Sequence, residues 1–288
     1  CNLFRPKAMI LNCLKIPTRT NPPSIRDFIV GFITAIVLMA GCAKERPNQP
    51  DTMRNTKKLD SLLLAYPQKG LLMADTLIRE AWNSADTSLA INLTLKKASW
   101  YQSHEMPDSA LAYYRKALLP ADHFRNDSLL ARCYNGLANY YLRKEDYRQA
   151  TYYLVRALEK AEKTGFAYME GLIHNGLGLV SVSMKRHSEA ITHFQKAWDI
   201  CEKHGDSLNM AGISMNIAGA WAELFKFEKA RAAYTESLSL VRRSGDTSQI
   251  ILALINLGIV ERHLGHSRVS LANLQEALNL LSNYPDRS

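Results

Sequence analysis

The chain has 288 residues, of which 47% are hydrophobic and 22% are charged, so it can form a buried core and is not intrinsically disordered. Its net charge of +9 is uneven, because residues 1–50 carry +5 and the whole rest of the chain carries only +4. The nearly neutral remainder argues against a nucleic-acid-binding surface, and we expect no nucleic-acid partner.

The first element along the chain is an apolar run at residues 28–40, FIVGFITAIVLMA, which follows Arg26. As a helix, these thirteen residues would span about 20 Å, less than the ~30 Å hydrocarbon core of a bilayer. We therefore predict a secretory signal, with a basic start and a short apolar centre, rather than a transmembrane helix. A short anchor helix that is not cleaved is the alternative.

The end of this run, residues 38–42 or LMAGC, resembles the lipobox of bacterial lipoproteins, with Met39 in the place of the usual leucine. The resemblance implies lipidation of Cys42, cleavage directly before it and acylation of the new N-terminus. Such lipid chains would attach the protein to a membrane, since each buried CH₂ contributes about 0.8 kcal/mol. We therefore expect a leader at residues 1–41, a lipidated polar tether at residues 42–58 and a lipid-anchored location in the bacterial cell envelope.

From about residue 91 the sequence resembles itself with a period of about 40 residues, which is the pattern of a repeat protein. Five series of residues keep this step over five units, some of them small and others bulky and apolar. Three of the series are Ala98, Ala138, Gly178, Ala218 and Gly258; Ala110, Ala150, Ala190, Ala230 and Ser270; and Tyr114, Leu154, Phe194, Tyr234 and Leu274.

Each unit is predicted to contain two amphipathic helices, called the first and the second helix below. Apolar residues recur every three or four positions, as at Tyr134, Leu137 and Tyr141 in a first helix and at Ala150 and Leu154 in a second helix. Small residues at fixed places let neighbouring helix axes approach closely, while the aromatic residues fill the gaps between hairpins. The sequence therefore predicts stacked helical hairpins.

The ends of the predicted helices carry suitable capping residues. Three second helices end in cations followed by Gly165, Gly205 and Gly245, and glycine tolerates the left-handed conformation that closes a helix. Asp206 and Asp246 come next and are predicted to cap the following first helices.

The small and aromatic residues of these units resemble the signature of the tetratricopeptide repeat, in the longer version found in kinesin light chains and bacterial signalling regulators. The resemblance implies an all-α fold, an α-α superhelix (α-solenoid) of five to six stacked hairpins over residues 59–288, and a role in binding proteins. A weaker first unit is predicted from Ala74, Ile78 and Ala81, which precede their counterparts by slightly less than one period. The matching residues are Tyr134, Leu137, Ala138, Tyr141, Ala150 and Leu154 in one unit, Leu177, Gly178, Ala190 and Phe194 in the next, and Ile217, Ala218, Trp221, Ala230 and Tyr234 in the third.

Residues that could carry out catalysis or hold a cofactor are not arranged for it in the sequence. The five cysteines form no CxxC pair, and Cys133 and Cys201 lie in apolar helical patterns where a thiol is usually buried. His263 and His266 flank a predicted turn without a third ligand nearby, and His187 and His193 are expected to be solvated. We therefore expect no cofactor, no metal and no enzymatic activity.

A polar stripe on the first helices is the candidate binding site. Arg132, Asn135, Asn139 and Arg143 follow one another at intervals of three and four positions, opposite the apolar face of their helix. In peptide-binding tetratricopeptide domains, similar asparagines bind the backbone of an extended ligand, because an amide both donates and accepts hydrogen bonds. The two arginines would add carboxylate recognition, whereas the alternative is that all these residues are merely solvated. The equivalent residues in later units are Asn175, Asn216 and Asn256.

The last predicted helix exposes apolar residues, Leu274, Leu278 and Leu281, where a solenoid normally has a polar cap. A second copy of the chain, another partner or a missing C-terminal domain would cover them. The sequence thus favours a non-enzymatic, envelope-anchored protein that binds a peptide or protein segment in its concave groove. The alternative is the sensory part of a membrane-associated bacterial signalling or transcription regulator.

Overall fold

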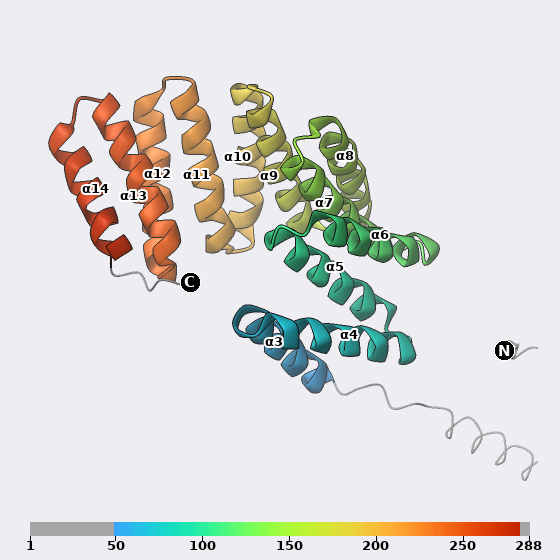
Figure 1. Cartoon of the computed structure of the whole chain (residues 1–288). Coiled ribbons are helices and arrows are strands. Elements are labelled where there is room, and N and C mark those ends of the chain that lie inside the picture. The colour runs from blue at the N-terminus through green and yellow to red at the C-terminus, as the bar shows by residue number, and fades with distance from the viewer. Residues whose placement is uncertain (1–48, 283–288) are drawn as a thin grey trace, which may run out of the picture. The chain divides into compact units, whose positions relative to one another are not determined.

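The computed structural model describes residues 49–282, which form twelve α-helices without a strand among them (Figure 1). The chain divides into two compact units, Cys1–Arg54 and Asn55–Ser288, and the description below concerns the second. The predicted leader, Cys42 and the start of the predicted tether lie outside the described residues. Among the described helices, none is long and apolar enough to cross a membrane.

The helices are of nearly equal length, and from Pro67 of α4 to Ser267 of α14 they begin at one constant interval, so the hairpin repeats with the predicted period. α3 begins at Gln49, inside the segment predicted as a tether. The first helices are α5 (Thr87–Ser103), α7 (Asp127–Arg143), α9 (Ala167–Ser183), α11 (Ser207–Glu223) and α13 (Thr247–His263), with α3 (Gln49–Ala65) before them. The second helices are α4 (Pro67–Asn83), α6 (Pro107–His123), α8 (Tyr147–Thr164), α10 (His187–Lys203), α12 (Phe227–Ser244) and α14 (Ser267–Ser282).

From α4 onward the turns between the helices share one conformation, whereas the α3–α4 connection differs, with Tyr66 at φ −142°. Residues with positive φ follow one another at the same interval as the helix starts, from Ala85 (φ 60°) to Gly265 (φ 81°). Gly165, Gly205 and Gly245 are among them, and Asp206 and Asp246 accept hydrogen bonds from the backbone of their own helices, so the predicted caps are confirmed. Six of these ten residues are not glycine, which shows that helix length rather than residue type sets this turn.

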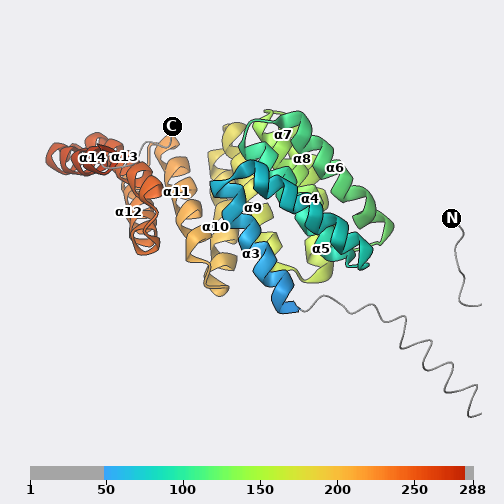
Figure 2. The same cartoon turned by 60° about the horizontal axis from the view of Figure 1, so that its bottom comes forward.

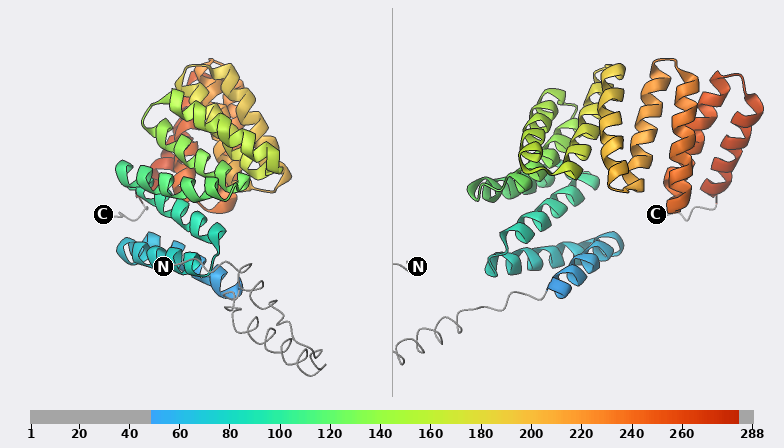
Figure 3. Two further views of the ribbon diagram at one scale, coloured as in Figure 1. Left: turned by 90° about the vertical axis from the view of Figure 1, so that its right-hand side faces the viewer. Right: turned by 180° about the vertical axis from the view of Figure 1, so that it is seen from behind.

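The helices of the second unit stack in chain order, each against the next, as Figure 1 and the rear view in Figure 3 show. In addition, α5 contacts α7, α7 contacts α9, and α9 contacts α11, so these four first helices form a continuous wall. Turning the molecule shows that the row of hairpins curves (Figure 2). The predicted all-α solenoid is therefore confirmed.

The small residues of the repeat allow close contact between helices, as predicted. A Cβ atom added at Gly178 would lie 2.4 Å from the ring of Phe194, so nothing larger than glycine fits there. Cys133 and Cys201 are buried free thiols, and burial raises the pKa of Cys133 to about 12. One expectation was wrong, because the first unit keeps the common period: α4 begins at Pro67 as α6 begins at Pro107, which makes Gly70 the counterpart of Ala110.

Candidate binding groove

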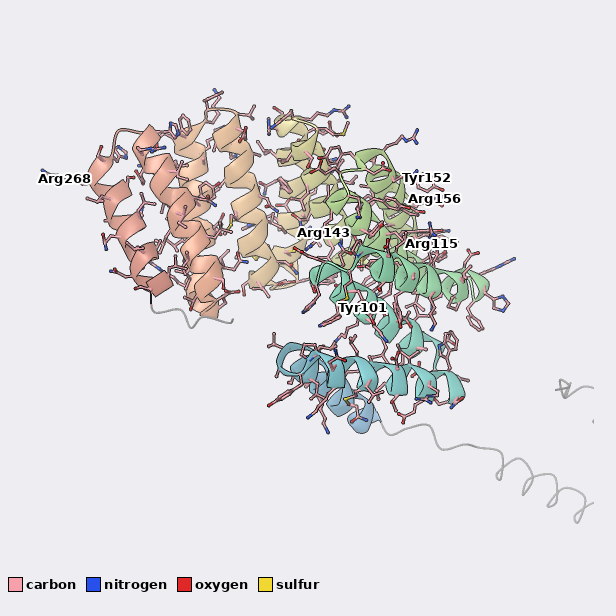
Figure 4. The ribbon with its side chains drawn as sticks, in the orientation of Figure 1. Tyr101, Arg115, Arg143, Tyr152, Arg156 and Arg268 are labelled. Atoms are coloured by element: carbon pink, nitrogen blue, oxygen red, sulfur yellow. The ribbon has the colours of Figure 1, made fainter. Side chains whose placement is uncertain are left out.

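The candidate site is built on α7, whose buried side packs against its neighbours and whose other side carries the predicted polar stripe. Leu137 and Ala138 are about 1% exposed and fix the helix by burial. Arg132, Asn139 and Arg143 are exposed, and Asn135 is half-buried. Figure 4 shows Arg143 on the inner side of the array of hairpins, whereas Tyr152 and Arg156 of α8 lie on the outer side.

Two adjoining hollows lie on this face, with volumes of about 370 and 320 Å³. All four predicted residues of α7 line one or both of them, and no acidic residue lines either. The larger hollow is lined by Asn92, Leu95, Lys96, Ser99, Tyr114, Arg132, Asn135, Gly136, Asn139 and Met169. The smaller is lined by Ser99, Gln102, Ser103, Tyr114, Asn139, Leu142, Arg143 and Leu179.

Asn135 lacks a hydrogen-bond partner at a buried atom. Its Oδ1 is shielded from solvent, yet no group of the described chain donates a hydrogen bond to it. An unpaired buried acceptor costs about 1–3 kcal/mol, so a donor that reaches Oδ1 would be bound favourably. Asn135 lines the larger hollow, so rotation of its amide group toward the hollow would present Oδ1 to a backbone N–H of a ligand there.

The cations at the site differ in how freely they can meet a ligand. Lys96 is already bonded to Asp60 of α3, with Nζ and Oδ1 2.5 Å apart. The guanidinium of Arg132 lies 5.0 Å from the centre of the Phe166 ring, and no described carboxylate forms an ion pair with Arg132 or Arg143. These two arginines therefore keep their charge available for an anionic group.

The asparagines of later hairpins do not form one straight row. Asn175 lies one full period after Asn135, but Asn216 lies one residue further than a period after Asn175, and its Nδ2 donates to Asn175 Oδ1 at 3.0 Å. Asn256 resumes the period from Asn216. The structure thus brings Asn175 and Asn216 together, and the row shifts by one residue between α9 and α11.

The floor of the hollows was not predicted. Tyr114 reaches it from α6 because Gly136 leaves room: a Cβ there would lie 2.4 Å from the ring. The Tyr114 hydroxyl donates to Gln102 Oε1 at 2.8 Å, and burial raises its pKa to about 12, so it stays neutral. A glycine in the middle of a helix pattern was the signal that could have revealed this contact.

The histidines behave differently from the prediction in two cases. His187 is half-buried, and its Nδ1 is shielded from solvent without a hydrogen-bond partner among the described residues. His193 is not solvated but half-buried, with its Nδ1 3.2 Å from Nδ1 of His174. His263 stacks on Phe227 and His266 Nδ1 lies 2.6 Å from a carboxylate oxygen of Glu261, so these two rings are engaged separately. Within residues 55–282, no group of three or more metal-binding side chains is present.

Comparison with known proteins finds matches to parts of the repeat array. The tetratricopeptide repeat family matches residues 130–164 and 209–283. The regulatory protein RapG of Bacillus subtilis is 26% identical over 132 residues, which cover 46% of this chain and 34% of RapG. The chain thus spans about a third of the length of that relative.

Solved structures show the same fold at low sequence identity. BtubC from P. vanneervenii aligns with a TM-score of 0.59 and 18% identity, over 83% of this chain and 94% of that one. The apo form of RapI aligns with a TM-score of 0.60 and 18% identity, over 67% of this chain and 70% of that one. At this identity the likeness concerns the fold alone.

Proposed function

We propose that the tetratricopeptide repeats of this chain form a non-enzymatic protein-interaction module, which holds a peptide or protein segment against the face of α5 and α7. The family match and the fold support the general role in protein binding. The single observation that carries the groove assignment is Asn135, whose buried Oδ1 lacks a donor beside a polar hollow without acidic residues.

In this mechanism the ligand runs along the wall of first helices. Asn135 accepts a backbone N–H of the ligand, and Asn139 and Asn175 supply further amide groups that both donate and accept. Arg132 and Arg143 bind carboxylate groups with paired N–H donors. No bond of the ligand is broken, so the result is capture alone.

The purified repeat unit can be tested with a displayed library of random dodecapeptides. We expect specific peptides to be enriched, and the variant Asn135→Ala with Asn175→Ala to bind them at least tenfold more weakly in calorimetry. Asn83→Ala, at the exposed end of α4, is the matched control and should leave affinity unchanged. If the double variant binds as tightly as the wild type, the groove assignment is refuted.

The proposal includes a lipid anchor at Cys42, which would place the module on a bacterial envelope membrane. Its support is the sequence LMAGC after an apolar run. Mass spectrometry of the mature N-terminus tests it: a lipidated Cys42 is expected, and a protein that begins upstream of Cys42 without a lipid would contradict it.

The similarity to a regulatory protein favours one second candidate, the sensory part of a signalling or transcription regulator. The reading frame after Ser288 separates the two candidates. A following membrane helix and helix-turn-helix would favour the regulator, and a stop codon there would favour the anchored module.

A further inference from the structure

The wall of first helices changes its chemistry along the chain. On α7 three positions of this face hold Arg132 and Asn139, which are exposed, and Asn135, which is half-buried. The same three positions on α13, three hairpins later, hold Leu252, Ile255 and Ile259, which are 45%, 36% and 41% exposed. These three side chains, called the α13 stripe below, form an aliphatic surface where α7 is polar.

Of the two first helices between them, α9 holds Leu172, Asn175 and Leu179 at the equivalent positions, all half-buried, whereas α11 carries almost no side chains on this face. Its equivalent positions hold Gly212, Met215 and Gly219. A Cβ at Gly212 would meet nothing within 4 Å, and one at Gly219 would meet only the Tyr234 hydroxyl, at 3.6 Å. A ligand can therefore approach the backbone of α11 closely, beside the α13 stripe.

The α13 stripe belongs to the groove face and not to the face that stacks on a following hairpin. The counterparts of Leu252 and Ile259 on α7 are exposed, although α9 and α10 follow them. By contrast, Leu281 of α14 is 56% exposed while its counterpart Val241 of α12 is 1% exposed, because the next hairpin covers that position. The equivalent positions on α9 and α11 are half-buried, so the stripe lies on a face that stays at least partly open to solvent in every hairpin from α7 on.

We infer that the ligand is a segment with acidic residues toward one end and aliphatic residues toward the other, its acidic end at α7 and its aliphatic end at the α13 stripe. This inference rests on the proposed function and adds the ligand class and its direction. Charge complementarity supports it, since Arg132 and Arg143 have no carboxylate partner among the described residues and no acidic residue lines the two hollows. Burial of the aliphatic side chains supplies affinity at the other end.

The length of such a segment follows from the spacing of the helices. Packed neighbouring helices lie about 8–10 Å apart, so the three steps from α7 through α9 and α11 to α13 span at least about 27 Å. An extended chain rises about 3.3 Å per residue, so the segment needs about eight or nine residues. A dodecapeptide is therefore long enough to contact both ends.

The experiment compares dodecapeptides selected by four forms of the chain. Wild type should enrich peptides with acidic and aliphatic residues in a fixed order. The variant Leu252→Ser with Ile259→Ser should lose only the preference for aliphatic residues in the selected peptides. The variant Arg132→Gln with Arg143→Gln should lose only the preference for acidic residues. Leu119→Ser with Val155→Ser, exposed on α6 and α8, is the matched control and should select as the wild type does.

Affinities of one selected peptide and of its reversed sequence give the magnitude. Each Leu or Ile lost from the half-exposed stripe should weaken binding about fivefold, so the double variant should bind about 25-fold more weakly. The reversed peptide has the same composition and should bind at least tenfold more weakly than the selected one. Helix content and melting temperature confirm that each variant is folded.

The outcomes separate this inference from the function on which it rests. If no peptide is enriched, the peptide-binding function itself fails. If peptides bind through Asn135 but the stripe variant and the reversed peptide bind unchanged, only the inference is overturned. It is also overturned if the wild type is a dimer that Leu252→Ser with Ile259→Ser converts to a monomer, because a second copy then covers the stripe.

Discussion

Acidification should weaken the hairpin of α9 and α10 through the pair His174–His193. Their Nδ1 atoms lie 3.2 Å apart, so one neutral imidazole donates a hydrogen bond to the other. Burial, followed by the charges of His193 and Lys196, lowers the pKa of His174 from 6.5 to about 4. Burial also lowers the pKa of His193, against the opposing charge of Glu189. Once both rings are protonated, both Nδ1 atoms carry hydrogen and the bond is lost.

The direction and size of the effect follow from these pKa values. Between pH 6.5 and about 4 the unfolded chain binds a proton on His174 that the folded chain does not, so the free energy of unfolding falls as the pH falls. At pH 5 the lowered pKa of His174 alone corresponds to a loss of about 2 kcal/mol in the free energy of unfolding. Because the ring is only half-buried, solvent screening reduces the expected loss to about 1 kcal/mol.

Urea unfolding of two proteins between pH 7.5 and pH 5 measures this loss. The reference variant is His174→Tyr with His193→Tyr, because one hairpin earlier Tyr134 and Tyr153 pair at the same positions, with ring centres 6.0 Å apart. The wild type should lose about 1 kcal/mol more than this variant over the range, and NMR titration of His174 should give a pKa well below 6.5.

The comparison cancels other acid-sensitive groups. Hydrogen bonds lower the pKa of Asp127. Burial raises the pKa of Asp206, but its hydrogen bonds outweigh burial and lower the pKa overall. Both carboxylates lose their stabilising effect below their usual pKa of 3.8, and they do so equally in the two proteins. If the difference in free energy of unfolding between the two proteins stays constant from pH 7.5 to pH 5, the reasoning about the histidine pair is refuted.

Three further predictions concern stability and are measured by urea unfolding. Gly136→Ala should destabilise the chain by about 2 kcal/mol, because its Cβ would lie 2.4 Å from the Tyr114 ring. Gly212→Ala has open space and should stabilise α11 by about 0.5–1 kcal/mol. Equal effects of the two substitutions would contradict the close contact between Gly136 and Tyr114. Lys185→Gly should raise the free energy of unfolding by about 0.5–1 kcal/mol, since φ of 62° at this position strains any residue with a side chain. A lower free energy of unfolding in this variant would contradict that strain. Asp75→Ala should destabilise by about 1 kcal/mol, because the Lys97 side chain, which is 3% exposed, loses the half-exposed carboxylate 2.6 Å away. Lys97→Met should be nearly neutral, and a larger loss from Lys97→Met than from Asp75→Ala would contradict this reasoning.

The helical hairpins and their stacking could be predicted because the same pattern of small and apolar residues recurs in five units of the sequence. A small residue such as Ala138 says little alone, but its recurrence in every repeat fixes which helix faces meet. The register of the first unit was misplaced by about one helical turn, since only three apolar residues supported it. Gly70, which the structure shows to be the true counterpart of Ala110, was present in the sequence and was overlooked.

Contacts that occur only once in the chain could not be predicted in the same way. The pairing of His174 with His193, and of Lys97 with Asp75, joins residues on different helices at positions where other hairpins have tyrosines, leucines or other residues. Their distance depends on how two helices are rotated against each other, which periodicity does not determine. The same holds for Asn175 and Asn216, whose hydrogen bond explains why their interval exceeds the period by one residue.

The turns show why the repeat tolerates unsuitable residues. Only four of the ten described residues with positive φ are glycine, and bulky Phe225 adopts φ 56°. A side chain in this conformation costs about 1–2 kcal/mol, while each core residue of a hairpin contributes a comparable or larger amount when buried. The stacking of helices of fixed length therefore imposes the turn on whatever residue lies there, and the sequence need not supply glycine.

The same argument separates the residues that specify the fold from those that select a ligand. Positions that must pack, such as Ala138 and its equivalents, stay small in the five hairpins from α5 to α14, because one larger side chain would disrupt the stack. Positions on the groove face carry no such restriction and differ from hairpin to hairpin, as Asn139 of α7 and Ile259 of α13 do. In a chain whose hairpins share one fold, the ligand can be recognised only through the positions at which the hairpins differ.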